Sequence, residues 1–159
     1  MADERTNAAA ITALNQYLTH HRMRKTAERY TILERVMATA GHFSADELHQ
    51  AIENDGYHVS RATVYNTIEV LVNAGIVRRH SFGAASAKFE TVSGISNHHH
   101  LVCSRCGKIK EIKDAEIDAL LSAKRFSGFT PAYADLYIYG LCGRCSRKKS
   151  KTSEKTNRK

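Results

Sequence analysis

Two pairs of cysteines carry the clearest chemistry in this sequence of 159 residues. Each pair has two residues between its members, Cys103 with Cys106 and Cys142 with Cys145, and together they use every cysteine of the chain. Four thiolates at such spacings are typical of a tetrahedral zinc site that leaves no coordination position open. The pattern therefore predicts a structural Zn²⁺ that supports folding and takes no part in catalysis.

Cysteines at these spacings have two other possible uses, disulfides and redox chemistry. Paired disulfides would need an oxidising compartment, yet the N-terminus Met-Ala-Asp-Glu-Arg-Thr is charged where a secretory signal is apolar. A redox Cys-x-x-Cys motif would explain one pair and leave the other without a role. No apolar stretch approaches the roughly 20 residues that span a bilayer. We expect a cytoplasmic protein with zinc-bound cysteines and no membrane partner.

The net charge of +8 is concentrated at one end of the chain. Between Arg147 and Lys159 there are seven Lys or Arg and one Glu, so this segment alone carries +6. The other 17 basic and 15 acidic residues leave only +2 for the rest. Residues 148–159 are predicted to form a disordered basic tail, which either adds non-specific affinity for phosphates or only keeps the chain in solution.

The N-terminal half begins with the periodicity of three helices. Apolar residues at helical spacing predict helices at 8–21 and 27–40, and Gly41 stands where a C-terminal cap belongs. Ser44 and Glu47 form the sequence signature of a capping box, which begins the third helix.

A fourth helix and two short strands follow. Ser60 is a suitable N-cap for a helix that ends near Ala74, before Gly75. Extended runs at 76–80 and 87–91, joined by a glycine-containing loop, predict a hairpin. Three of these helices followed by the hairpin indicate a winged helix, a variant of the helix-turn-helix motif.

The second half is predicted to be a separate, smaller unit after a linker at 92–97. Strands are expected near 98–103, 108–112 and 134–141. A helix is expected at 114–125, with its apolar side chains facing inward; these are Ile117, Leu120 and Leu121. About 50 residues form a small core, so bound zinc would contribute much of the stability of this unit.

Taken in order, several motifs resemble the ferric uptake regulator family. They are Arg61-Ala-Thr-Val-Tyr-Asn66, Phe89-Glu90, His98-His-His-Leu-Val-Cys-Ser-Arg-Cys-Gly-Lys108 and Leu136-Tyr-Ile-Tyr-Gly-Leu-Cys142. The resemblance covers roughly residues 10 to 147. It implies an α+β protein with an N-terminal winged helix and a small α/β dimerisation domain that holds the four-cysteine zinc site. The expected division is 1–91 for DNA binding, 92–97 for a hinge, 98–147 for dimerisation and metal binding, and 148–159 for the tail.

The same resemblance implies a regulatory metal site that joins the two domains. Its ligands would be His42, Glu90, His98, His100 and Glu111. Alternation along a strand agrees with this set, because residues two apart share a face and His99 then lies on the other face. Histidine and carboxylate without sulfur suit Fe²⁺, Mn²⁺, Co²⁺ or Zn²⁺, and the resemblance favours iron. The resemblance also implies that the protein is a homodimeric repressor and not an enzyme.

Two departures from the family pattern bear on the metal. Peroxide-sensing members use aspartate at the acid positions, whereas this chain has Glu90 and Glu111, which favours sensing of metal availability. An auxiliary site in many members needs a histidine where Ala134 stands, with Asn97 and His99 at its other positions. We therefore expect this third site to be altered or absent. A zinc- or other-metal-uptake regulator and a peroxide sensor remain alternatives.

The DNA contacts implied by the resemblance lie at two places in the winged helix. Tyr65 would pack on thymine methyl groups in the major groove, and Asn66, where many members have arginine, could pair with adenine. Arg24 would reach an A·T-rich minor groove. The remaining expected contacts are Lys25, Arg29, Arg61 and Thr63. The partner would be double-stranded DNA with an A·T-rich palindromic operator.

Two functions of other classes could also use these residues. A zinc hydrolase could use the histidine cluster with Glu90 or Glu111 as a base, but no His-Glu-x-x-His helix is present. A purely structural zinc protein could bind nucleic acid through its tail alone, which predicts salt-dependent binding without dependence on sequence or metal.

Overall fold

The computed structural model describes residues 4–81, 87–92, 98–131 and 134–147. The chain divides into two compact units, Met1–Ile95 and Ser96–Lys159, and each is described by itself. Most of the predicted hinge and the whole predicted tail lie outside the described residues. Within the described residues, every helix is too short or too polar to cross a lipid bilayer.

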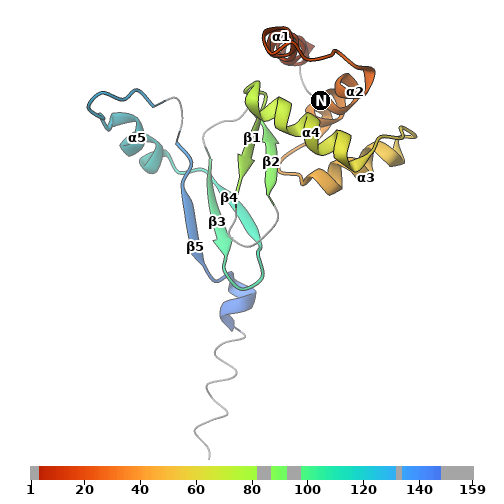
Figure 1. Ribbon diagram of the computed structural model, residues 1–159. Coiled ribbons are helices and arrows are strands. Elements are labelled where there is room, and N and C mark those ends of the chain that lie inside the picture. Colours follow the sequence, from red (N-terminus) through yellow and green to blue (C-terminus); the bar gives the residue numbers. More distant parts are fainter. Residues whose placement is uncertain (1–3, 82–86, 93–97, 132–133, 148–159) are drawn as a thin grey trace, which may run out of the picture. The chain divides into compact units, whose positions relative to one another are not determined.

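Four helices build the first unit (Figure 1). They are α1 (Glu4–His20), α2 (Ala27–Ala38), α3 (Ala45–Asn54) and α4 (Arg61–Asn73). The α3 helix starts with the predicted capping box: the Ser44 hydroxyl accepts from the Glu47 amide at 3.2 Å, and the Glu47 carboxylate accepts from the Ser44 amide at 2.6 Å. The Ser60 hydroxyl accepts from the Thr63 amide at 3.0 Å and caps α4. Both caps satisfy amides that a helix start leaves without partners.

A two-stranded hairpin completes the winged helix. Strand β1 (Val77–His80) pairs antiparallel with β2 (Lys88–Thr91), with Val77 opposite Thr91. The chain leaves α4 through Gly75, whose φ of 72° lies in the left-handed region that glycine adopts without strain. The predicted winged helix is confirmed.

The core of the first unit lies among the four helices and the hairpin. Fully or almost fully buried side chains come from each of them, including Phe89 of the hairpin; the large aliphatic ones with almost no exposure are Leu14, Leu18, Ile32, Leu33, Leu48, Ile52, Ile68 and Leu71. Each such side chain contributes about 1.5–3 kcal/mol on burial. The core therefore holds α3, α4 and the hairpin in one arrangement.

The second unit contains a three-stranded sheet and the helix α5 (Figure 1). Strand β3 (His99–Cys103) lies between β4 (Ile109–Ile112), which is antiparallel to it, and β5 (Tyr137–Gly140), which is parallel. Helix α5 (Ala115–Ala123) begins at Asp114, whose carboxylate accepts from the amides of Glu116 and Ile117.

The prediction that the apolar side chains of α5 face inward is wrong for the single chain. Leu120 is 73% exposed, Leu121 is 38% exposed and Ile117 is only half-buried. Nine residues of helix beside a three-stranded sheet cannot enclose an apolar stripe, so it remains on the surface. The strand expected over 134–141 is also shorter, Tyr137–Gly140, and α1 begins four residues before its predicted start.

Glu47 gives a pH-dependent test of the α3 start. Hydrogen bonds from Lys88 and from the Ser44 amide hold the pKa of this carboxyl below its usual range. A depressed pKa in the folded state contributes stability that is present above the ordinary pKa and is lost as the pH falls through the folded one.

We expect Glu47→Gln to lower the free energy of unfolding by about 0.2–1 kcal/mol at pH 7, because the pair with Lys88 is exposed. The difference from the wild type should shrink as the pH falls through the lowered pKa of Glu47. Urea unfolding followed by far-UV circular dichroism from pH 7 to pH 3 measures it. Glu34→Gln, at an exposed position of α2, serves as the control. A difference that grew on acidification would contradict the assignment.

Candidate metal centres and DNA-recognition helix

The four cysteine sulfurs gather at one end of the sheet in the second unit. All four lie within 4.8 Å of one another, and the Cys106 and Cys142 sulfurs are 3.8 Å apart. Two thiolates that are each roughly 2.3 Å from a tetrahedral zinc ion are separated by about 3.8 Å. A disulfide would bring its sulfurs to about 2.05 Å. All four cysteines are free, and the donor set fits one Zn²⁺ with four thiolates.

Backbone amides prepare this cluster for a cation. The Cys142 amide donates to the Cys103 sulfur at 3.3 Å. Amides from Cys142 and then from Cys106 lower the pKa of Cys103 to about 6, which favours its thiolate. Burial raises the pKa of Cys145 to about 12. A bound dication would offset that burial, because thiols that coordinate zinc are deprotonated.

The glycines beside the two cysteine pairs have different roles. Gly107 has φ of 68°, and its amide donates to the Cys103 carbonyl at 2.9 Å, so this turn needs the left-handed conformation. Gly143 instead begins a short helical segment at 143–147. Of these two glycines, only Gly107 adopts the left-handed conformation.

In the first unit, one carboxylate lies between two histidines. The Glu90 oxygen Oε2 is 3.4 Å from His42 Nε2, and its other oxygen, Oε1, is 2.8 Å from His80 Nε2. The rings of His42 and His80 meet edge to face, with centroids 5.1 Å apart. Glu90 is 5% exposed and His80 is fully buried. Two of the expected regulatory ligands, His42 and Glu90, thus lie together.

Backbone pairing sets the spacing of these two ligands. The Phe43 amide donates to the Phe89 carbonyl at 2.8 Å, and the Phe89 amide donates back to the Phe43 carbonyl at 2.7 Å. His42 and Glu90 are the neighbours of these two residues in sequence. The loop before α3 is therefore attached to β2 beside the carboxylate.

In the second unit, two of the three consecutive histidines share a face. The rings of His98 and His100 have centroids 4.8 Å apart, and His100 stacks on Tyr137 at 5.2 Å. Glu111 lies opposite His100 in the β3–β4 register. His99 is buried on the other face, with Nε2 3.5 Å from an oxygen of Asp118 in α5. This unit brings His98, His100 and Glu111 to neighbouring positions.

Sequence reasoning missed His80 and Tyr137 as residues around the ligands. One signal for His80 was available, because residues 76–80 and 87–91 were expected to pair. In that pairing His80 lies opposite Lys88, two residues before Glu90, so His80 and Glu90 share a face of the hairpin. Buried carboxylates need polar partners, so a histidine at that place was a candidate. Tyr137 had no comparable signal, because its contact with His100 depends on the parallel pairing of β3 with β5.

The α4 helix presents two side chains expected to contact bases. Tyr65 is 47% exposed and Asn66 is also exposed, whereas Val64, Ile68 and Leu71 on the other face are buried. Thr63 is half-buried, and its hydroxyl is 2.8 Å from the hydroxyl of Ser60. Tyr65 and Asn66 are therefore accessible to a ligand, while Thr63 belongs to the helix start.

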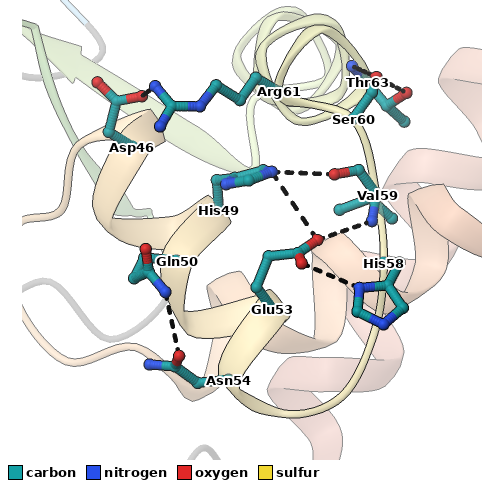
Figure 2. Close-up of polar contacts among 10 residues, drawn as sticks. All are labelled: Asp46, His49, Gln50, Glu53, Asn54, His58, Val59, Ser60, Arg61 and Thr63. Carbon is teal, nitrogen blue, oxygen red and sulfur yellow. Dashed lines mark hydrogen bonds and ion pairs between the residues drawn. The ribbon is translucent and has the colours of Figure 1, made fainter.

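Polar contacts brace the turn between α3 and α4 (Figure 2). Glu53 on α3 is 3.0 Å from His58 Nδ1 through one oxygen, and its other oxygen accepts from the Val59 amide at 3.2 Å. The hydrogen bond from His58 lowers the pKa of Glu53. His49 Nε2 contacts the Val59 carbonyl at 2.9 Å. These contacts fix the residues that lead into α4.

The basic residues expected to contact DNA differ in their exposure and in their present hydrogen-bond partners. Arg61 pairs with Asp46 at 3.2 Å while its side chain stays 71% exposed, so a phosphate could replace the carboxylate (Figure 2). Arg24 and Lys25 are exposed in the turn before α2. The Arg29 guanidinium donates to the Arg24 carbonyl. Arg29 therefore braces the segment that leads into α2.

Comparison with known proteins identifies the group to which this chain is related. The sequence pattern of the ferric uptake regulator family matches residues 20–139. The chain belongs to the ferric uptake regulator family. Its relatives include the peroxide operon regulator of Bacillus subtilis (strain 168), which is 35% identical over 129 residues, or 80% of this chain and 88% of that protein.

Solved structures of ferric uptake regulators share its fold. The Pseudomonas aeruginosa regulator with manganese matches with a TM-score of 0.68 at 31% identity, covering 81% of this chain and 97% of that one. The Vibrio cholerae regulator matches with a TM-score of 0.61 at 34% identity, covering 80% and 98%. Members of the ferric uptake regulator family are dimeric DNA-binding regulators, and this chain is a metal-responsive regulator of that family.

Removal of one sulfur tests the thiolate cluster. We expect Cys103→Ser to bind no zinc at this place and to lose the ordered sheet of the second unit, because structural zinc in small domains contributes on the order of 10 kcal/mol. Zinc content per chain and amide hydrogen exchange in β3 measure the two effects. Ser104→Ala, at the exposed neighbouring position, is the control. Retained zinc at one ion per chain with protected β3 amides would contradict the assignment.

Proposed function

We propose that this chain is a homodimeric repressor that binds specific DNA when a divalent metal, in the first place Fe²⁺, occupies a regulatory site made of His42, Glu90, His98, His100 and Glu111. Cys103, Cys106, Cys142 and Cys145 would hold a separate, permanent Zn²⁺. The observation that carries the proposal is the pairing of His42 with Glu90 in one unit of a ferric uptake regulator. The repressor would act in the cytoplasm, where its operator DNA is found.

The donor chemistry supports a reversible regulatory ion. Imidazole and carboxylate groups bind Fe²⁺, Mn²⁺, Co²⁺ and Zn²⁺, and they hold iron less permanently than four thiolates hold zinc. His42 and Glu90 belong to the winged-helix unit, whereas His98, His100 and Glu111 belong to the sheet unit. An ion that used both sets would link the units, so that metal binding would favour one arrangement of the two.

Such a link would couple metal to DNA. In a homodimer, two α4 helices must reach successive major-groove faces about 34 Å apart. If the metal favours the arrangement that fits this spacing, DNA affinity rises with metal and, by thermodynamic reciprocity, metal affinity rises with DNA. The operator would be an A·T-rich palindrome, read by Tyr65 and Asn66 in the major groove and by Arg24 in the minor groove.

The first test combines metal and DNA titrations. We expect the wild type to bind DNA from upstream of its own regulated genes only with added Fe²⁺ or Mn²⁺, and His98→Ala to remain a dimer while losing this dependence. Gel shifts with each metal and size-exclusion chromatography measure the two properties. His20→Ala, at an exposed position of α1, is the control. If His98→Ala bound the operator as the wild type does, the regulatory site would be misassigned.

A second test separates base contacts from phosphate contacts. We expect Asn66→Ala to cost about 1–3 kcal/mol on the best operator and to relax the preference at one A·T pair. Lys25→Ala should weaken binding to all sequences alike and reduce the dependence of log K on log salt by about one. Affinities on an operator and on a scrambled duplex at several salt concentrations distinguish them. Equal losses on both duplexes for Asn66→Ala would remove it from the base contacts.

Peroxide sensing is a second candidate, because the Bacillus subtilis relative is a peroxide operon regulator. The acids at the expected ligand positions are Glu90 and Glu111, whereas peroxide-sensing members of the family resemble this chain but carry aspartate. Fe²⁺ reacts with hydrogen peroxide and Mn²⁺ resists it. Loss of operator binding by the iron form alone after peroxide treatment would favour this candidate over sensing of metal availability.

A further inference from the structure

His80 is a fully buried histidine that none of the functions above requires. It ends β1, and its cross-strand partner is Lys88, while Arg78, two residues earlier, pairs with Glu90. Residues two apart on a strand share a face, so His80 and Glu90 are diagonal neighbours on one face of the hairpin. Their side chains meet there, with Nε2 and Oε1 2.8 Å apart.

This contact defines the roles of both groups. An ionised carboxylate only accepts hydrogen bonds, so His80 donates its Nε2–H to Glu90 Oε1. At 2.8 Å the contact has the length of a charge-assisted hydrogen bond. It satisfies one oxygen of a nearly buried carboxylate, which would otherwise be costly to bury.

The second oxygen of the same carboxylate has a different environment. Glu90 Oε2 is 3.4 Å from His42 Nε2, longer than a good hydrogen bond. Two ligand atoms that are each roughly 2.1 Å from a tetrahedral ion are separated by about 3.4 Å. The carboxylate therefore has one oxygen bound to a protein donor and one oxygen at a ligand-like distance from an imidazole nitrogen.

We propose that His80 is a positioning residue of the regulatory metal site: its hydrogen bond to Oε1 fixes the carboxylate of Glu90, whose Oε2 would bind the ion together with His42 Nε2. This inference rests on the proposed regulatory site and adds to it a residue outside the ligand set. Hydrogen-bond partners of metal ligands typically change metal affinity 10- to 100-fold when they are removed. A histidine that only stabilised the hairpin would leave metal affinity unchanged in the folded protein.

The test measures Co²⁺ affinity on full-length protein whose four cysteines are already loaded with zinc. We expect His80→Leu, which fills the same buried place without a donor, to weaken Co²⁺ binding 10- to 100-fold. His80→Gln, which can still donate from its side-chain amide, should stay within about threefold of the wild type. His20→Leu, on the exposed surface of α1, is the matched control and should bind as the wild type does.

A measurement on the wild type keeps the inference testable if His80→Leu does not fold. Long-range ¹H–¹⁵N spectra report the protonation and coordination of each imidazole nitrogen. On addition of Zn²⁺ to the regulatory site, His80 should keep its Nε2–H, and neither of its ring nitrogens should move to a coordinated position. A nitrogen of His42 should do so. Coordination of His80 itself would overturn the positioning role.

Two further variants separate failure of this inference from failure of the proposed function. If Glu90→Gln and His98→Ala leave the Co²⁺ affinity unchanged, the regulatory site itself is wrong. If both weaken it while a folded His80→Leu binds Co²⁺ as the wild type does, only the role of His80 is wrong. Equal weakening by His80→Leu and His80→Gln would also overturn it, because an amide donor would then fail to replace the imidazole.

Discussion

Convergence of four cysteine sulfurs at one end of the sheet is the interaction on which the second unit depends. Cys103 ends β3, Cys106 lies in the turn to β4, and Cys142 and Cys145 follow β5. One ion held by all four would fix the ends of three strands together. The strands on their own bury few side chains: among the described residues of this unit, only four of β3 and the later Cys145 are buried, the four being His99, His100, Val102 and Cys103.

The strand register fixed at this end also sets the face on which the imidazoles lie. His100 is opposite Glu111 on one side and Tyr137 on the other. A slip by one residue would exchange His99 for His100 and turn the ligand face into the opposite face. The cysteine cluster would therefore influence the proposed regulatory site through the strand register, without sharing an atom with it.

Much of the first unit could be predicted because its signals are local. Ser44 with Glu47, Ser60 and Gly75 mark helix ends through hydrogen bonds and backbone conformation that involve only a few neighbouring residues. The exposure of Leu120 could not be predicted in this way, since it depends on how much sheet is available to cover a helix. The partnership of His80 with Glu90 required strand pairing as well as sequence, and the ligand set itself came from family resemblance.

The exchange of two backbone hydrogen bonds between Phe43 and Phe89 has a mechanical consequence. It attaches the segment preceding α3 directly to the hairpin, so a displacement of His42 would also displace the hairpin. Lys88 and Glu47 add a second attachment between the same two elements. A displacement of the His42 imidazole would thus move α3 and the hairpin together, and a flexible loop would absorb little of it.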